Sequence, residues 1–464
     1  MVTPADPLLE AWSRTLTNRR ADPAIFDARG RVLFRFSELE DLSRHYETER
    51  ASGLGNFAPG EIVALQIGNH AHWPAIFLAS LRRGTILLPI EQTVSESERA
   101  SALQTCRAAG LLEIPGEPIA RLEPAGSIDW EWRPVLLKLT SGTTAAPRAI
   151  RFRSAQLLAD AEQICDTMKI TDGDLNFAVI PLAHSYGFSN LITPLLARGV
   201  ALAVSSDRMP RAVLDDLACT EATVFPGMPL FYQAFNEISS PPPLPKLRLC
   251  ISAGAPLGQG VARSFHEKFG ISIHSFYGAS ECGGICYDRT ATAEVEGFVG
   301  RPMEGVDVQR LNSKTEPSQI RVRSGAVGDG YFPEPEPAKL GGGFFLPDDL
   351  VTKSARGFRI VGRLSDVINV AGKKVNPAEV EAHLLTFEGV RQAVVFGRAS
   401  ALRNQEVVAC VVAGNAIDEA ELLAFCRARL SGWQVPKRIF FLDALPANER
   451  GKVSRRELAE QFGG

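Results

Sequence analysis

The chain alternates short apolar runs with longer stretches of helical periodicity. Residues 61–67 and 84–89 are apolar runs of strand length, and residues 73–82 between them repeat their apolar positions as a helix does. This alternation predicts parallel strands joined by crossover helices. The same rhythm returns at residues 175–181, 199–204, 222–225, 247–253 and 271–276. We therefore expect an α/β fold with two stacked α/β layers.

The pattern changes in the last third of the chain. Residues 297–323 contain short apolar runs separated by turn residues, which predicts a small β-rich unit. Residues 325–343 are rich in proline and glycine and are predicted to form a loop. Beyond them, strand patterns at 357–362, 394–397 and 407–412 alternate with helical patterns at 377–386 and 418–429. We expect a large N-terminal domain over residues 1–364 and a small, mobile α+β domain over 365–464.

Length and composition fit this organisation. With 464 residues the chain exceeds the roughly 250–300 residues at which a single core stops growing. Hydrophobic residues make up 45% and charged residues 22%, which excludes the disordered and fibrous classes. The net charge of −3 does not favour nucleic acid or an anionic membrane as a partner, so a small-molecule substrate fits better.

Other sequence features bear on location. No stretch of about 18 uninterrupted apolar residues is present, so we expect no integral membrane segment. The N-terminal residues do not have the pattern of a signal peptide. The 8 cysteines are scattered without the spacing of a disulfide framework or a zinc site. We expect a cytoplasmic protein without a structural metal.

One segment gathers hydroxyl side chains around a glycine and ends in a basic residue. It is formed by Thr140, Ser141, Gly142, Thr143, Thr144 and Arg148. Hydroxyl and backbone N–H groups can surround a polyphosphate, and arginine adds a charge-assisted fork. A surface turn would explain this segment alone equally well. It lacks the Gly-Lys-Ser/Thr ending of the P-loop, which argues against kinases, motors and GTPases of that type.

A second cluster follows the strand pattern at residues 271–276. It contains Tyr277, Gly278, Ser280 and Glu281. Groups at the carboxyl end of a parallel strand face the ligand crevice of an α/β sheet. There Tyr277 can stack on a purine, Ser280 can bond a phosphate, and Glu281 can hold Mg²⁺ beside a nucleotide. Taken singly, each of these residues is also explained by a structural role.

Together these segments resemble the adenylate-forming superfamily, which includes acyl-CoA synthetases, aryl-CoA ligases, adenylation domains and firefly luciferase. The hydroxyl-rich segment is similar to its phosphate loop, and 277–281 is similar to its Tyr-Gly-x-Thr-Glu motif. Further matching segments follow in the family's order over almost the whole chain: 252–257, 297–302, Asp349-Leu350, Gly362-Arg363, 372–375 and 448–453. Six or more such matches in order make a specific signal.

The chain also departs from the family pattern. Ala145 stands in place of the loop glycine, Arg148 in place of lysine and Ser280 in place of threonine. The pair Pro347-Asp348 precedes Asp349 where Thr-Gly is usual. Because alanine is restricted where glycine permits a positive φ, the phosphate loop is expected to be stiffened or reshaped.

The resemblance implies an ATP- and Mg²⁺-dependent ligase that converts a carboxylic acid to acyl-AMP with release of pyrophosphate. Lys452 would bridge the carboxylate and the α-phosphate. Asp349 and Arg363 would bind the ribose, and the adenine would lie against the nucleotide-binding positions Gly254, Ala255, Tyr277 and Gly278. Glu281 would hold the magnesium ion.

The resemblance also implies a second half-reaction, in which the acyl group passes to a pantetheine thiol. The C-terminal domain would swing about a hinge at Ser365, and Gly372 and Lys373 would lie near the thiol tunnel. The acyl pocket would be lined by His184, Tyr186, Gly187 and Gly254. Coenzyme A is the expected acceptor, and the phosphopantetheine arm of an acyl carrier protein is the open alternative.

Two further classes compete with a fatty or aryl acid–CoA ligase. Amino-acid adenylation enzymes normally hold the substrate's ammonium group with an aspartate, and Ala183-His184 offers no carboxylate at that place. A degenerate nucleotide-binding protein would not need Glu281, Asp349, Arg363 and Lys452 in this order. A hydrolase of the Gly-x-Ser-x-Gly type is excluded, because that motif does not occur.

Overall fold

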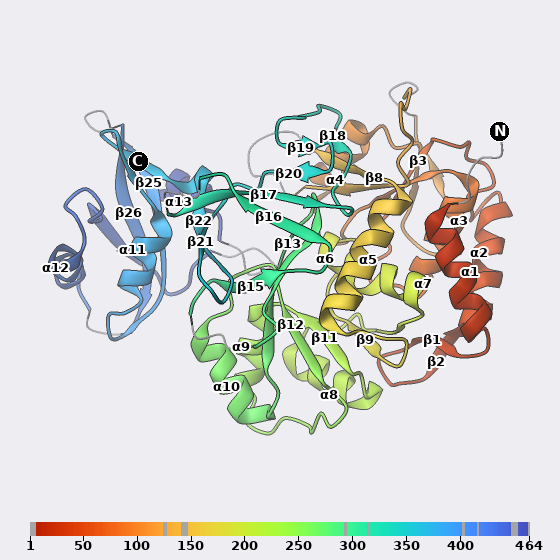
Figure 1. The fold of residues 1–464 in the computed structure, drawn as a ribbon, viewed down its shortest axis with the longest axis horizontal. Coiled ribbons are helices and arrows are strands. Elements are labelled where there is room, and N and C mark those ends of the chain that lie inside the picture. Colours follow the sequence, from red (N-terminus) through yellow and green to blue (C-terminus); the bar gives the residue numbers. More distant parts are fainter. Residues whose placement is uncertain are drawn as a thin grey trace. The chain divides into compact units, whose positions relative to one another are not determined.

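The computed structural model describes residues 6–123, 128–140, 147–291, 295–312, 316–400, 404–414, 417–446 and 453–462. The chain divides into two compact units, each of which is described by itself (Figure 1). The first comprises Met1–Gln309, Arg321–Pro347 and Ala355–Phe358, and the second comprises Arg310–Ile320, Asp348–Ser354 and Arg359–Gly464. The expected boundary between 364 and 365 and the mobility of the C-terminal domain stay predictions.

One large sheet includes, as consecutive neighbours, the strands β15-β14-β13-β12-β11-β9-β10-β1-β2 of the first unit, and it continues beyond β15. These strands are β1 (Pro23–Phe26), β2 (Val32–Arg35), β9 (Leu175–Ala178), β10 (Ala201–Val204), β11 (Val224–Gly227), β12 (Leu249–Ser252), β13 (Ile273–Ala279), β14 (Gly283–Tyr287) and β15 (Phe298–Pro302). Strands β9 to β13 pair in parallel, so their carboxyl ends lie at one edge. The crossover helices α8 (Pro210–Thr220), α9 (Pro229–Glu237) and α10 (Gln259–Phe269) contribute to the core over these strands (Figure 1).

A second sheet of this unit has the order β18-β8-β7-β4-β3-β5-β6. Its strands are β3 (Ile62–Leu65), β4 (Ile86–Pro89), β5 (Gly110–Leu112), β6 (Ala120–Arg121), β7 (Leu136–Leu139), β8 (Ala149–Phe152) and β18 (Gly330–Phe332). Every residue of β3 and β4 is buried, as expected for parallel strands that are covered on both faces.

The prediction of a loop over residues 325–343 is wrong in part. Strand β18 pairs antiparallel with β8, with Tyr331 opposite Ile150. A second short strand, β19 (Leu340–Gly341), pairs with β20 (Phe344–Phe345). The many proline and glycine residues around these strands weaken the strand pattern in the sequence. An edge strand such as β18 tolerates proline nearby, because one of its sides makes no backbone hydrogen bonds to another strand.

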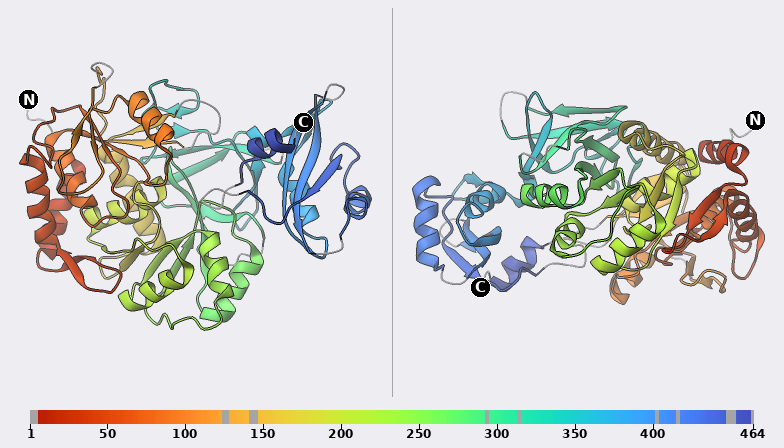
Figure 2. Two further views of the ribbon diagram at one scale, coloured as in Figure 1. Left: turned by 180° about the vertical axis from the view of Figure 1, so that it is seen from behind. Right: turned by 90° about the horizontal axis from the view of Figure 1, so that it is seen from below.

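Helices and helical turns complete the first unit. They are α1 (Pro7–Arg19), α2 (Phe36–Thr48), α3 (Trp73–Arg83), α4 (Glu96–Cys106), α5 (Ser154–Met168), α6 (Ser185–Gly187), the π-helical turn η1 (Phe188–Ile192) and α7 (Thr193–Arg198). Helix α1 packs against α2, α5 and α7. The expected α/β class is confirmed, and Figure 2 shows these helices from two further directions.

The second unit has its own sheet, of order β24-β23-β26-β25, with β27 paired to β26. Its strands are β23 (Ile368–Val370), β24 (Lys373–Val375), β25 (Val390–Ser400), β26 (Asn404–Ala413) and β27 (Arg438–Phe441). Helices α11 (Pro377–Leu384) and α12 (Glu419–Arg429) pack against one set of strand side chains, and α13 (Arg455–Phe462) packs against the other (Figure 2). The expected α+β character of the C-terminal region is confirmed.

Further short elements lie between residues 306 and 366. They are β16 (Val306–Arg310), β17 (Ser318–Ser324), β21 (Asp349–Lys353), β22 (Phe358–Arg363) and the 3₁₀ turn η2 (Leu364–Asp366). In the part of the chain that the structure describes, no helix has both the length and the apolar character needed to cross a bilayer.

Candidate active site

The predicted phosphate loop connects two antiparallel strands of the second sheet. Strands β7 and β8 pair from Leu136 opposite Phe152 to Leu139 opposite Ala149. Beyond them, the Thr140 N–H and the Thr140 hydroxyl both donate to the Arg148 carbonyl oxygen, at 2.8 and 3.2 Å. These bonds hold the two ends of the loop together. Ser141, Gly142, Thr143 and Thr144 lie outside the described residues, as does Ala145.

Arg148 and Glu281 share a common neighbour, Tyr331 of β18. The Tyr331 hydroxyl donates to Glu281 Oε1 at 3.0 Å, and the Arg148 guanidinium lies 4.1 Å from the centre of the Tyr331 ring. Arg148 also donates to the Glu334 carbonyl oxygen at 3.2 Å and lies 3.4 Å from the Glu336 carboxylate. Burial and, next, the Glu281 carboxylate raise the pKa of Tyr331, so the phenol keeps its proton at neutral pH.

The predicted adenine positions follow the parallel strands β12 and β13. Gly254 and Ala255 are exposed just beyond the end of β12, and Gly254 has a φ of +85°. Among the described residues, a Cβ at Gly254 would come within 4 Å of Met228 alone, at 3.9 Å, so there is room for a side chain but the positive φ favours glycine. Tyr277 is buried within β13, and the adjoining Gly278 is exposed. These residues therefore lie at the edge where ligands bind in α/β sheets.

The predicted acyl-pocket segment, residues 181–190, lies against the same edge. Tyr186 packs with Phe276 of β13, and its hydroxyl is 3.4 Å from the Gly227 carbonyl oxygen at the end of β11. The hydroxyls of Ser185 and Ser280 are 2.9 Å apart. Gly187 admits no side chain, because a Cβ there would lie 2.1 Å from the Pro181 carbonyl oxygen.

His184 has a local role in this segment. Its Nδ1 accepts a hydrogen bond from the Tyr186 N–H at 3.1 Å and so caps the short helix α6. This bond fixes the orientation of the imidazole at the start of α6. The segment as a whole joins the carboxyl edge of the first sheet to the Ser280-Glu281 turn.

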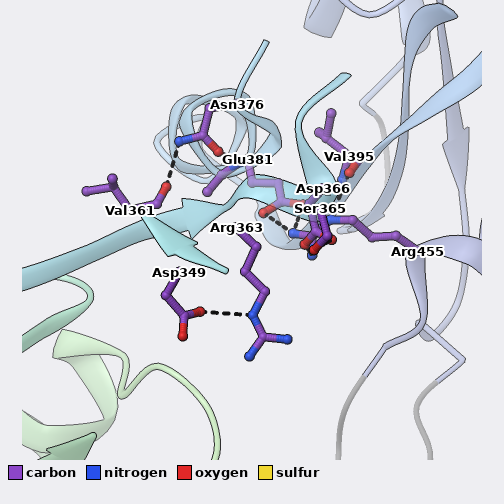
Figure 3. Close-up of polar contacts among 10 residues, drawn as sticks. Asp349, Val361, Arg363, Ser365, Asp366, Asn376, Glu381, Val395 and Arg455 are labelled. Carbon is purple, nitrogen blue, oxygen red and sulfur yellow. Dashed lines mark hydrogen bonds and ion pairs between the residues drawn. The ribbon is translucent and has the colours of Figure 1, made fainter. Parts of the chain in front are cut away.

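The predicted ribose-binding pair belongs to the second unit. Asp349 is 8% exposed, and its Oδ1 accepts from Arg363 Nε at 3.0 Å (Figure 3). The Leu364 N–H donates to the Asp348 carbonyl oxygen at 2.6 Å, which keeps β21 close to the end of β22. Ser365, the predicted hinge, follows in the turn η2 and lies 3.3 Å from Asp366 Oδ1.

The predicted thiol-tunnel residues lie in the β23–β24 turn. Gly372 has a φ of +85°, its N–H donates to Asn369 Oδ1 at 2.9 Å, and a Cβ there would meet no atom within 4 Å in the described structure. Lys373 is exposed and its ammonium lies 4.0 Å from the centre of the Trp433 ring. This arrangement leaves open space at Gly372 beside a cationic and aromatic surface.

Lys452 lies outside the described residues, but its neighbour in sequence, Arg455, is anchored firmly. Arg455 contacts the Asp366 carboxylate at 2.8 Å, both oxygens of Glu381 at 2.7 and 2.9 Å, and the Val395 carbonyl oxygen at 3.0 Å (Figure 3). A bidentate guanidinium–carboxylate pair is geometrically specific. It fixes the start of α13 three residues after Lys452.

Comparisons with known proteins identify the family. A model for AMP-binding enzymes matches residues 18–332, and a model for the C-terminal domain of AMP-binding enzymes matches residues 379–452. The chain belongs to the AMP-binding enzyme family. The resemblance to the adenylate-forming superfamily is thereby confirmed, and the protein is an AMP-forming acid–thiol ligase.

Several relatives and solved structures are similar to this chain over most of its length. The AMP-binding enzyme is 27% identical to oxalate–CoA ligase from Arabidopsis thaliana over 98% of each chain. It is 29% identical to feruloyl-CoA synthase from Amycolatopsis sp., over 89% of this chain and 91% of that one. Its fold is similar to that of ATP-bound MatB from Rhodopseudomonas palustris, with a TM-score of 0.82, 24% identity and 98% of each chain covered.

Sequence reasoning missed three residues of this AMP-binding enzyme that contact or support the predicted site. Tyr331 falls in the segment predicted to be a loop, although the run Gly-Tyr-Phe is a short strand signal. Lys138 is the one charged residue in the leucine strand β7, and this isolated charge could have drawn attention to it. Arg455 carried none, because a single basic residue at the start of a helix is ordinary.

Proposed function

We propose that this AMP-binding enzyme activates a fatty or aromatic carboxylic acid as its acyl-AMP and then transfers the acyl group to coenzyme A. The observation that carries the proposal is the contact of Glu281 and Arg148 with one residue, Tyr331. It brings the predicted metal-binding carboxylate to the hairpin that carries the predicted phosphate loop. The names of two relatives, oxalate–CoA ligase and feruloyl-CoA synthase, support coenzyme A as the thiol acceptor.

The acidic group near the phosphate loop suits magnesium. Among the described residues, no group of three or more His, Cys, Asp or Glu side chains is arranged to hold a metal ion. Mg²⁺ does not need such a cage, because it is commonly held by one or two carboxylates together with substrate phosphates. Glu281 would supply the carboxylate, and the ion would neutralise negative charge on the phosphates. The residues present therefore fit magnesium bound with ATP.

Adenylation needs orientation and charge stabilisation more than acid–base chemistry. A carboxylic acid is already ionised at pH 7, so one carboxylate oxygen attacks the α-phosphorus and pyrophosphate leaves with the electrons of the broken P–O bond. Hydroxyl and N–H groups of the loop from Thr140 to Arg148 would hold the phosphates. Lys452 would stabilise the negative charge that develops at the α-phosphate, which is usually the largest catalytic contribution.

The second half-reaction uses the β23–β24 turn. The acceptor thiolate attacks the acyl carbon, the C–O bond to the phosphate breaks, and AMP leaves. The open space at Gly372 would admit a narrow pantetheine arm. Lys373 would attract the phosphates of coenzyme A. A carrier-protein acceptor presents the same arm and remains the alternative acceptor.

A pyrophosphate-release assay tests the proposal. The acids are octanoate, hexadecanoate, benzoate, ferulate, oxalate and phenylalanine, each with ATP and Mg²⁺, followed by coenzyme A or a phosphopantetheinylated carrier protein. We expect release with a fatty or aromatic acid and thioester formation with coenzyme A. Lys452→Ala should abolish release without changing the melting temperature. Normal release by a folded Lys452→Ala variant, or release with phenylalanine alone, would overturn the proposal.

A further inference from the structure

A lysine is buried directly before the predicted phosphate loop. Lys138 belongs to β7, two residues ahead of Thr140, and is only 4% exposed. Its strand neighbours Leu136 and Leu137 are completely buried. Burial of an ammonium group is rare unless it is paired, so this residue calls for an explanation.

The ammonium group has a small set of neighbours. Its Nζ donates to Ser189 Oγ at 3.2 Å and lies 4.7 Å from the ring centre of Phe152 and 5.4 Å from that of Phe188. Two aromatic faces can stabilise a cation that has lost most of its hydration. The hydrogen bond and the two rings hold the ammonium at one place between β7 and the turn η1.

An ionisable group of another element acts on Lys138. Burial lowers the pKa of Lys138, and the carboxylate of Asp160 in α5 opposes this shift by favouring the charged form. Asp160 Oδ1 also accepts from the Gly284 N–H at 3.1 Å. Lys138 therefore contacts η1 directly through Ser189. It is also attracted to the carboxylate of Asp160, which accepts a hydrogen bond from Gly284 shortly after Glu281.

Stability alone does not account for a lysine here. A buried ammonium loses its hydration, and burial lowers the pKa of Lys138, so the folded protein disfavours its charged form. The rest of β7 is leucine, so an apolar residue would suit the strand. The contact that Lys138 makes between β7 and η1 offers a different explanation.

The hydrogen bond to Ser189 reaches the predicted acyl-pocket segment. Ser189 lies in η1, which directly follows the pocket residues Tyr186 and Gly187, and π-helical turns occur frequently at functional sites. In the same turn, Asn190 Nδ2 donates to the Tyr186 carbonyl oxygen at 3.1 Å. His184 Nδ1 accepts from the Tyr186 N–H. A continuous set of contacts thus runs from the strand of the phosphate loop to the residues that would face the acid.

We propose that Lys138 is a positioning residue for adenylation. Through Ser189, it holds the acyl-pocket segment at a fixed distance from β7 and so aligns the acid's carboxylate with the α-phosphate bound at the loop. It does not touch the substrate, because it is buried. This inference rests on the proposed function and adds a residue that acts on the acid through its pocket.

The test uses the full-length protein and the acid that gives the fastest pyrophosphate release in the panel above. Lys138→Met removes the charge and keeps a chain of similar length, and Ser189→Ala removes the acceptor alone. Ser80→Ala is the matched control, since Ser80 of α3 is 1% exposed and its hydroxyl lies 2.8 Å from the hydroxyl of Thr85, which follows that helix. The readouts are kcat, the KM values for acid and for ATP, and the melting temperature.

We expect kcat/KM for the acid to fall about tenfold in Lys138→Met and Ser189→Ala, because small misplacements of reacting groups are costly. The KM for ATP should stay within about twofold, and the melting temperature of Lys138→Met should be unchanged or higher. Ser80→Ala should match the wild type in both KM values. This split between the two substrates is not expected from a purely structural residue.

Two results would overturn the inference while leaving the proposed function intact. One is an active wild type whose Lys138→Met and Ser189→Ala variants have the same KM and kcat for the acid. The other is a fall in activity that follows a lowered melting temperature and affects acid and ATP equally. A wild type that releases no pyrophosphate with any acid would overturn the proposed function itself, and the inference with it.

Discussion

The phenolic hydroxyl of Tyr331 donates a hydrogen bond to the carboxylate of Glu281 across 3.0 Å. The two residues come from different sheets, since Tyr331 belongs to the edge strand β18 and Glu281 follows β13. Arg148 covers the Tyr331 ring at 4.1 Å. The carboxylate proposed to bind magnesium is therefore oriented by a residue that also supports the end of the phosphate loop.

Tyr331→Phe should weaken this orientation without removing the ring beneath Arg148. We expect the Mg²⁺ concentration for half-maximal pyrophosphate release to rise and kcat/KM for ATP to fall about tenfold, equivalent to about 1.4 kcal/mol. The free energy of unfolding should fall by about 1 kcal/mol, as for one lost hydrogen bond. Steady-state kinetics over a magnesium titration and urea unfolding measure these effects.

Tyr232→Phe is the matched control. Its buried hydroxyl donates to the Ile251 carbonyl oxygen at 2.9 Å, so the variant loses a comparable bond away from Glu281. It should show a similar loss of stability and an unchanged magnesium requirement. An identical magnesium titration for Tyr331→Phe and Tyr232→Phe would show that Tyr331 does not orient Glu281.

Arg455→Leu should loosen the start of α13, because it leaves Glu381 and Asp366 without their cation. These partly buried charge-assisted bonds predict a loss of about 2 kcal/mol in the stability of the second unit. Pyrophosphate release should fall as well, since Arg455 anchors the chain beside Lys452. Thermal unfolding and the release assay measure both effects.

The neighbouring residue supplies the control for this change. Arg456 forms an exposed ion pair with Glu460 at 2.9 Å, a contact of the kind that contributes about 0.3–0.5 kcal/mol. Arg456→Leu should therefore leave release and unfolding nearly unchanged. Equal behaviour of the two leucine variants would contradict the anchoring role of Arg455.

Gly372→Leu should spare pyrophosphate release and block thioester formation. The new side chain would extend into open space, where we propose that the pantetheine arm enters. A positive φ costs a leucine roughly 1–2 kcal/mol, and this strain must be separated from the block.

Gly270→Leu separates the two effects. Gly270 ends α10 with a φ of +71°, and no atom of the described part of the chain lies within 4 Å of a Cβ there, so a leucine meets a similar strain outside the proposed tunnel. It should retain both half-reactions. If Gly372→Leu forms the thioester at the wild-type rate, the tunnel does not pass this residue.

The difference in the free energy of unfolding between Lys138→Met and the wild type should depend on pH. Burial lowers the pKa of Lys138 in the folded protein, whereas the unfolded chain titrates near the ordinary value of about 10.4. Between the two values the unfolded chain binds more protons, so wild-type stability rises with pH. The stability difference between Lys138→Met and wild type should therefore be largest at neutral pH and shrink as pH approaches 10.

Melting temperatures of both proteins across pH 7 to 10 measure this effect. Lys246→Met removes an exposed lysine and serves as the control. A constant difference for Lys138→Met would mean that the native state does not disfavour the charged lysine.

Most of the fold could be predicted from the sequence, because its signals are local. The apolar runs that became β3, β4 and β9 to β13 lie within a few residues of their predicted bounds. The segment 325–343 was the exception, since β18 is stabilised by its pairing with β8 rather than by its own residues. Composition alone could not distinguish that short edge strand from a loop.

The α/β class, the order of the motifs and the adenylate-forming chemistry that they imply can be read from the amino-acid sequence. Which side chains support one another in the site is visible in the folded chain alone. Tyr331 meets Glu281 across 50 residues, Lys138 meets Ser189 across 51, and Arg455 meets Glu381 across 74. Hydrophobic periodicity is a local property of the chain, whereas these contacts depend on which strands become neighbours. A role for the buried Lys138 could therefore be proposed only once its hydrogen-bond partner, Ser189, was known.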